Sequence, residues 1–202
     1  MADHQKYILK ILKDDYPSAE EIFRFQQEYE ITKGLVFDGL RRVHKYEKIN
    51  SRHSLLMEYF SGQSLRRLIQ QGKIDNLRIF LELAISIADV VHKIHQQGII
   101  HKDIKPDNLL AEIETADIRL IDFGLATRIT LKNASLTPPE KLEGTLAYIS
   151  PEQTGRMNRT VDYRSDFYSL GITFYEMMTG QLPFIATDSL ELVHCHIAKK
   201  PV

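Results

Sequence analysis

The sequence predicts an α+β fold with two lobes, a strand-rich lobe over residues 1–60 and a helix-rich lobe over residues 61–202. Two observations support this prediction. Short apolar runs bounded by turn residues dominate the first sixty positions, and two long helical patterns dominate the remainder. A chain of 202 residues with 43% hydrophobic residues is large enough for one sizeable core or two smaller ones.

The strand-rich part begins with an apolar run at residues 7–13 that ends at a turn-like Asp14-Asp15-Tyr16-Pro17 sequence. A helix is expected after Ser18, because Ser18 and Glu21 have the spacing of a capping box, and apolar residues then recur at helical spacing up to Gly34. Two further strands are expected at 42–49 and 54–60, with residues 50–52 as the turn between them.

Two helices are expected in the helix-rich part. The first covers residues 77–97 and ends at Gly98, and the second covers 167–178 and stops before Gly180. Short apolar runs at 99–100, 109–110 and 118–121 lie between them, and a last helix contains His194. The buried stripe of the first helix is expected to consist of Leu77, Phe80, Leu81, Ala84, Ile87, Ala88, Val91 and Ile94.

Charge and cysteine content exclude several classes of protein. The formal net charge is −1, which argues against nucleic acid as a partner, because phosphate binding usually requires a basic surplus. The single cysteine, Cys195, suits a reducing compartment, so a cytoplasmic location is expected. No signal peptide and no apolar stretch of ~18 residues is found, so no membrane span is expected.

The chemistry is concentrated in two short motifs. His101-x-Asp103 is followed after four residues by Asn108, and Asp122-Phe123-Gly124 comes after the next predicted strand. This layout can hold a general base, a lysine directed at phosphate and two metal ligands around one triphosphate.

With these motifs the chain resembles the eukaryotic-like Ser/Thr protein kinases. It is most similar to the kinase-like domain at the front of large bacterial hybrid sensor kinases, on the sequence of residues 143–159 and of residues 162–171. The resemblance implies ATP and Mg²⁺ as cofactors and a protein substrate with a Ser or Thr hydroxyl. It also implies further sensor, ATPase or histidine kinase domains in a longer parent chain.

The resemblance assigns roles around the phosphates. Asp103 would accept the proton of the substrate hydroxyl, and Lys105 would reach the transferred phosphate. Asn108 and Asp122 would ligate Mg²⁺. Thr145 would contact Asp103 and Lys105, whereas His101 is expected to be structural.

The resemblance also assigns the nucleotide contacts. Lys10 would pair the α and β phosphates and be oriented by Glu28, with Glu30 as the alternative partner. Residues 57–60 would form the gatekeeper and hinge between the lobes. The backbone groups of Glu58 and Phe60 would bind adenine, and Leu110 would lie under the ring.

The chain departs from the family in four places. The first glycine is Gly34, so no Gly-rich loop precedes Lys10, and Ile8 stands where the family commonly has alanine. Lys102 replaces the usual arginine before Asp103, which removes a bidentate phosphate contact. The chain ends at Val202, so we expect both lobes to be incomplete and the protein to be truncated at both ends.

The expected truncation has consequences for the helix-rich lobe. The arginine partner of Glu152 in the family would lie beyond Val202, so Glu152 should be exposed, protonated or paired differently. Leu170, Phe174 and Met177 should form an uncovered apolar patch.

Three functions remain open. The first is a Ser/Thr protein kinase, the second is a catalytically weak nucleotide-binding or scaffold module, and the third is a small-molecule phosphotransferase. The third has no use for the segment 144–152, which forms a peptide platform in protein kinases.

Overall fold

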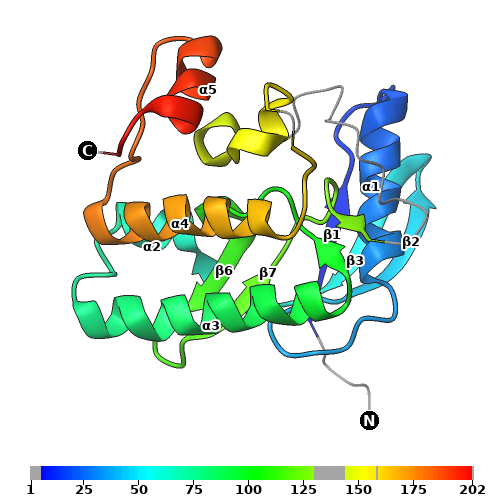
Figure 1. The fold of residues 1–202 in the computed structure, drawn as a ribbon. Coiled ribbons are helices and arrows are strands. Elements are labelled where there is room, and N and C mark those ends of the chain that lie inside the picture. Colours follow the sequence, from blue (N-terminus) through cyan, green and yellow to red (C-terminus); the bar gives the residue numbers. More distant parts are fainter. Residues whose placement is uncertain (1–5, 130–143, 158, 202) are drawn as a thin grey trace.

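The computed structural model describes residues 6–129, 144–157 and 159–201, and it has the expected α+β architecture. Figure 1 shows a strand-rich part beside a larger part built mainly from helices. In the strand-rich part, β1 (Tyr7–Ile11), β3 (Arg52–Glu58) and β2 (Val43–Ile49) form an antiparallel sheet in the order β1-β3-β2. The helix α1 (Ala19–Thr32) packs on this sheet through Phe25, which joins Val43, Leu55 and Met57 in a small core.

The start of α1 is the predicted capping box. The backbone N–H of Glu21 donates to Ser18 Oγ over 3.2 Å, and the backbone N–H of Ser18 donates to Glu21 Oε2 over 2.8 Å. These bonds satisfy two amide groups that have no partner within the helix. The helix ends at Thr32, two residues before Gly34.

The turn between β2 and β3 is shorter than predicted. Asn50 and Ser51 have φ values of 49° and 66°, as the two central residues of a type I′ turn require. A two-residue turn lets the strands pair directly next to it, so Arg52 pairs with Ile49 and belongs to β3. The prediction that Arg52 lies in the turn is therefore wrong.

The helix-rich part is built around α3 (Leu77–Gln96) and α4 (Arg164–Thr179), which lie side by side in Figure 1. The other helices are α2 (Leu65–Gln70) and α5 (Ser189–Ala198), and single 3₁₀ turns occur at Pro106–Asn108 (η1), Leu146–Tyr148 (η2) and Pro151–Thr154 (η3). One small sheet has the order β4-β6-β7, with β4 at Gln63–Ser64, β6 at Leu109–Glu112 and β7 at Asp117–Leu120. A second, two-stranded sheet is formed by β5 (Ile99–Ile100) and β8 (Thr127–Arg128). The elements α2, β4 and β8 are too short to have been predicted from the apolar pattern.

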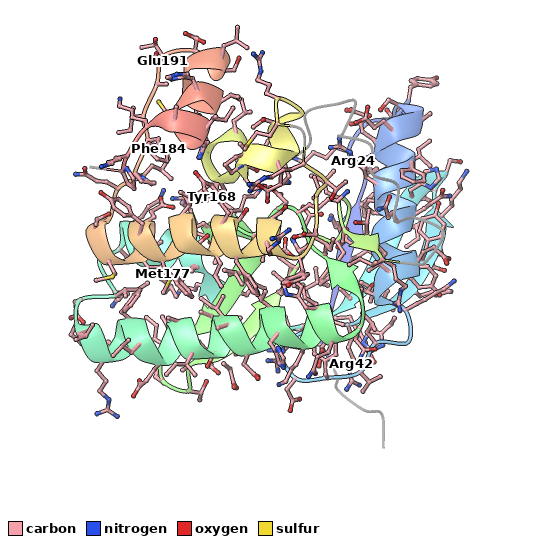
Figure 2. All side chains as sticks on the ribbon, viewed as in Figure 1. Arg24, Arg42, Tyr168, Met177, Phe184 and Glu191 are labelled. Atoms are coloured by element: carbon pink, nitrogen blue, oxygen red, sulfur yellow. The ribbon has the colours of Figure 1, made fainter. Side chains whose placement is uncertain are left out.

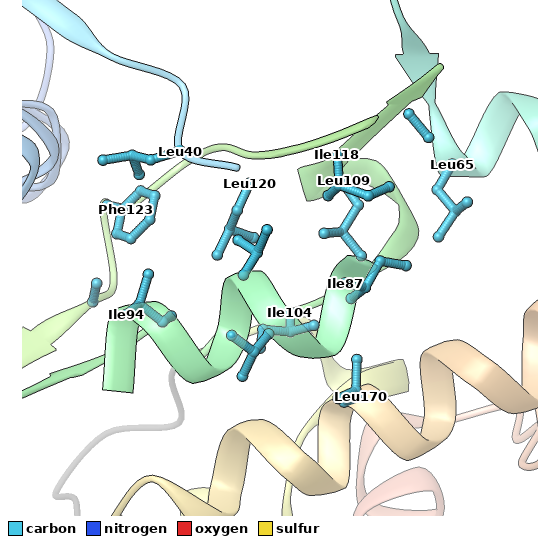
Figure 3. Packing of buried hydrophobic residues seen from close by; sticks show 14 of the residues in the cluster. Leu40, Leu65, Ile87, Ile94, Ile104, Leu109, Ile118, Leu120, Phe123 and Leu170 are labelled. Atoms are coloured by element: carbon cyan, nitrogen blue, oxygen red, sulfur yellow. The ribbon is translucent and has the colours of Figure 1, made fainter. Parts of the chain in front are cut away.

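The main core lies between α3, β6, β7 and α4 (Figure 3). The buried face of α3 is centred on Ile87 and Val91. Leu77, Leu81 and Ala88 lie on the flank of that face and are exposed, so their predicted places in the stripe are wrong. The stripe consists of Leu83, Ala84, Ile87, Val90, Val91 and Ile94.

The apolar patch predicted on α4 is also absent among the described residues. Leu170 and Met177 are buried in the main core, because α4 packs against α3. Phe174 meets Phe80 of α3 edge-to-face, with ring centroids 6.0 Å apart. The alternatives for Glu152 are resolved in favour of a new partner, since Ser165 Oγ donates to Glu152 Oε1 over 2.6 Å.

The helices of the described ranges lack the combination of length and apolar character that crossing a bilayer requires.

Candidate active site

A cavity of about 500 Å³ lies where the strand-rich and helix-rich parts meet. The strand-rich part contributes β1 and the first turns of α1, including Arg24 (Figure 2). The helix-rich part contributes the loop before η1, the segment after β7 and the start of the segment at Gly144. Five predicted site residues line the cavity: Lys10, Glu28, Asp103, Lys105 and Asp122.

Asp103 is the most heavily bonded of these side chains. Its Oδ1 accepts hydrogen bonds from the backbone N–H of Thr145 (3.1 Å) and from Thr145 Oγ1 (2.8 Å). Its Oδ2 accepts from Lys105 Nζ (2.6 Å) and from Asn108 Nδ2 (2.9 Å). The predicted contacts of Thr145 with Asp103 and Lys105 are confirmed. Four donors therefore fix the position of one carboxylate.

Asp166 of α4 anchors the loop that carries Asp103, and the Asp166 side chain is fully buried. Asp166 accepts from the backbone N–H groups of His101 (2.9 Å) and Lys102 (2.8 Å) and contacts His95 Nε2 over 2.8 Å. The anchor holds Lys102 in a left-handed conformation, with φ of 66°. His101 is buried against Phe123 and its Nε2 contacts the carbonyl oxygen of Ile121 over 3.1 Å, as expected for a structural residue.

Lys10 and Glu28 form the pair predicted between β1 and α1. Lys10 Nζ lies 2.6 Å from Glu28 Oε2 and 3.5 Å from Asp122 Oδ1. Glu28 is 2% exposed, and burial raises its pKa, while the charge of Lys10 counteracts the rise. The alternative partner, Glu30, is on the surface and pairs with Lys33. The pairing is therefore confirmed for Glu28, and its role in nucleotide binding stays a prediction.

Asn108 and Asp122 have the donor chemistry that Mg²⁺ requires. The amide nitrogen of Asn108 donates to the carbonyl oxygen (2.8 Å) and carboxylate of Asp103, so its Oδ1 remains as an acceptor. Asp122 has φ of 65°, and its side chain is 47% exposed at the cavity. An amide oxygen and an accessible carboxylate oxygen suit a hard cation that keeps much of its shell of water and phosphate.

The predicted adenine contacts lie apart from this group. Glu58, Phe60 and Leu110 are absent from the described lining of the cavity. The backbone N–H of Glu58 donates to the carbonyl oxygen of Arg42 (2.9 Å), and its own carbonyl oxygen accepts from Arg41 Nε (3.0 Å). Both backbone groups of Glu58 thus already have partners in the protein.

Two arginines beside the predicted hinge were missed by the sequence analysis. Besides Arg41, Arg119 of β7 places its guanidinium 4.9 Å from the centre of the Phe60 ring and pairs with Leu110 across the β6–β7 ladder. The sequence carries no signal for Arg41, because a single arginine before a strand is typical of a surface residue.

The segment after Gly144 is tied to the helices by a buried cluster. Tyr148 Oη donates to Glu176 Oε2 of α4 over 2.5 Å, and Arg66 of α2 donates to both Glu176 and Tyr148. Ser169 Oγ donates to the carbonyl oxygen of Tyr148 over 2.8 Å. These contacts give residues 146–148 a fixed position beside Asp103.

Comparison with known proteins agrees with the motifs. Residues 1–201 match the protein kinase domain family. The chain is 31% identical over 195 residues to a probable serine/threonine-protein kinase of Clostridium perfringens, covering 96% of this chain and 28% of that protein. It is 32% identical over 191 residues to a probable serine/threonine-protein kinase of Clostridium acetobutylicum, covering 94% of this chain and 28% of that protein. It is 30% identical over 204 residues to the serine/threonine-protein kinase PknB of Mycolicibacterium smegmatis, covering 98% of this chain and 32% of that protein. The chain thus spans less than a third of the length of these relatives.

Proposed function

The chain belongs to the protein kinase domain family, and on that basis we propose that it transfers the γ-phosphate of ATP to a Ser or Thr hydroxyl of a protein. Family membership implies ATP use and protein substrates, whereas catalysis by this chain is the proposal. The observation that carries it is the Asp103 carboxylate, which four hydrogen bonds hold at a cavity that Lys10, Lys105 and Asp122 also line.

In this proposal Asp103 is the group that receives the hydroxyl proton. As the hydroxyl oxygen forms its bond to phosphorus and the bond to the leaving diphosphate breaks, the proton passes to a carboxylate oxygen of Asp103. Thr145 and Asn108 hold that carboxylate in one orientation, so little reorganisation is needed during the transfer.

The cationic side chains balance the charge of the phosphates. Lys105 lies within 2.6 Å of Asp103, so it reaches the point at which the phosphate meets the hydroxyl. Lys10 lies at the other wall of the cavity, where Glu28 directs it toward Asp122. Asn108 and Asp122 would hold Mg²⁺, which when bound neutralises phosphate charge.

The segment at residues 146–148 supports a protein substrate rather than a small molecule. Tyr148, Glu176 and Arg66 hold this segment directly after Thr145, which contacts Asp103. A small phosphate acceptor has no use for such a platform, so the observation favours a peptide.

The residue boundary between lobes near 60 and the cytoplasmic location stay predictions.

We also propose the second function, a catalytically weak nucleotide-binding or scaffold module, as the alternative. The observation that favours it is the engaged carbonyl of Glu58, which removes an expected free acceptor for adenine. For both functions, the similarity of residues 143–159 and 162–171 to hybrid sensor kinases suggests a longer parent chain with sensor, ATPase or histidine kinase domains.

The test is label transfer from ATP to a mixture of acceptor proteins in the presence of Mg²⁺. Label from the γ position should appear in phosphoserine or phosphothreonine after acid hydrolysis, and label from the α position should not. Asp103→Asn should lose this transfer. The matched control is Asp107→Asn, which neutralises an exposed carboxylate in η1 and should retain transfer. Nucleotide binding without transfer would favour the scaffold, and label in small molecules alone would favour the phosphotransferase.

A further inference from the structure

Three cationic side chains line the described cavity, and carboxylates of the same cavity already neutralise two of them. Lys10 pairs with the buried Glu28 over 2.6 Å. Lys105 pairs with the buried Asp103, also over 2.6 Å. A triphosphate with one bound Mg²⁺ still carries negative charge, and a lysine that is already paired offsets less of it than a free cation does. The third cation, Arg24 of α1, is therefore the group to consider.

Arg24 is paired in a different way from the two lysines. Its Nη2 lies 2.6 Å from Oε1 of Glu20, which is one turn earlier on the same helix. Glu20 is about half exposed and is absent from the described lining of the cavity. Among the residues that the structure describes, this ion pair is the one polar contact of the Arg24 side chain. An exposed pair at this spacing is weak, so Arg24 can exchange Glu20 for a ligand at little cost.

Arg24 also lies close to the groups that are proposed to act on the phosphates (Figure 2). A β-carbon at Gly124 would lie 3.4 Å from Arg24 Cβ and 3.4 Å from Asp122 Oδ1. Arg24 and the carboxylate of Asp122 thus flank the same point of the cavity wall, on which Thr145 and Asp103 also lie. The long side chain of Arg24 can therefore reach a phosphate in this part of the cavity.

We propose that Arg24 is a specificity-determining residue that binds the terminal phosphate of the nucleotide, so that the site distinguishes ATP from ADP. A guanidinium suits this role because it donates two parallel N–H bonds to two phosphate oxygens. The terminal phosphate is the one concerned, because Arg24 shares the cavity with Asp103 and Lys105 and not with the predicted adenine contacts. This inference rests on the proposed function and adds a third cation to it.

The test compares two nucleotides in the presence of Mg²⁺: ADP, and an ATP analogue whose β–γ bridge cannot be hydrolysed. In Arg24→Gln the ATP analogue should bind about tenfold more weakly, which corresponds to about 1.4 kcal/mol, while ADP affinity should change less than about twofold. Arg24→Lys keeps the charge but loses the paired N–H groups, so its affinity for the ATP analogue should fall between the two. Titration calorimetry measures each dissociation constant.

Two further variants separate phosphate binding from a structural role of the ion pair. Arg78→Gln is the matched control, because Arg78 forms the same kind of pair on α3, with Glu82 over 2.8 Å, and is absent from the described lining of the cavity. Both dissociation constants should stay unchanged in this variant. Glu20→Gln releases Arg24 without removing its guanidinium, so the ATP analogue should bind at least as tightly as it does to the unaltered chain.

Two results would overturn the role of Arg24. One is an unchanged ratio of the two dissociation constants in Arg24→Gln, measured on protein whose circular dichroism matches that of the unaltered chain. The other is a loss of affinity in Glu20→Gln as large as in Arg24→Gln, since the pair would then act by stabilising α1. Binding of neither nucleotide to the unaltered chain would instead refute the proposed nucleotide site itself.

Discussion

Asp103 and Lys10 line the same cavity, but the protein holds them in different ways. The carboxylate of Asp103 receives four hydrogen bonds, and its loop is anchored to α4 through the buried Asp166. Lys10 depends on a close ion pair with Glu28 and a longer contact to Asp122, and its side chain is 39% exposed. One wall of the cavity is therefore rigidly built, and the other rests mainly on a single pair.

The difference indicates that Asp103 and Lys10 have different roles. A group that must meet a reacting atom in one geometry needs preorganisation, because a small displacement is costly in rate. A group that holds the mobile phosphates of a nucleotide can be fixed by the ligand itself. Substitutions that loosen the Asp103 carboxylate or its anchor should thus affect stability and turnover, and substitutions of the groups that hold the metal and the phosphates should affect nucleotide affinity.

Among the effects on stability and on nucleotide affinity, the largest is expected on stability, at Asp166. In Asp166→Asn the three donors around this buried carboxylate lose their charged acceptor, and the free energy of unfolding should fall by about 3 kcal/mol. Chemical denaturation followed by circular dichroism measures the change. Asp162→Asn removes a surface partner of Arg164 and should cost under about 0.5 kcal/mol. Equal losses in the two variants would refute the anchoring role.

A smaller effect is expected for the metal site. Asp122→Asn should weaken binding of Mg²⁺-nucleotide by roughly one hundredfold, about 2.7 kcal/mol, because a charged ligand oxygen is lost. The difference in nucleotide affinity between the variant and the unaltered chain should disappear when EDTA removes Mg²⁺, because the Asp122 carboxylate then has no cation to ligate. Calorimetry with and without the metal decides the matter, and equal affinities with Mg²⁺ would exclude Asp122 as a ligand.

The smallest effect is expected for the glutamate of the strand-rich wall. Glu28→Gln should weaken nucleotide binding by about tenfold, while Glu30→Gln, an exposed control on the same helix, should not. The affinity should also depend on pH. Burial raises the pKa of Glu28, so as the pH falls Glu28 takes up a proton earlier than an ordinary glutamate does. Lys10 then loses its charged partner.

Affinity of the unaltered chain should therefore fall as the pH is lowered, and Glu28→Gln should lose this dependence. Fluorescence titrations with a labelled nucleotide across the pH range measure both curves. A pH dependence that persists unchanged in Glu28→Gln would show that another group is responsible.

Features that depend on neighbours in sequence were predicted well. The capping box of Ser18 and Glu21 needs only three residues of spacing, and the convergence of Asp103, Lys105 and Asn108 needs only six consecutive positions. The pairing of Lys10 with Glu28 is a longer inference that came from the family resemblance. The structure confirms it, because α1 packs on the sheet of β1, β3 and β2 through Phe25 and Lys10 Nζ lies 2.6 Å from Glu28 Oε2.

Features that depend on tertiary packing were not predicted. The side chains of Arg66 and Glu176 meet across 110 positions, and neither has a local signal for the other. The burial of Leu170 and Met177 follows from how α4 lies on α3, and the exposure of Leu77 and Leu81 follows from the rotation of α3 about its axis. Arg41 was missed because a single arginine before a strand reads as a surface residue.

The most direct test of the account is to measure turnover and nucleotide affinity on the same preparation of Asp103→Asn. The account predicts that γ-phosphate transfer falls by at least about one thousandfold, a loss of about 4 kcal/mol in transition-state stabilisation, while the dissociation constant for Mg²⁺-nucleotide changes less than about threefold. Transfer that continues at the rate of the unaltered chain would contradict it, because the reaction would then not depend on the carboxylate around which this wall of the cavity is built.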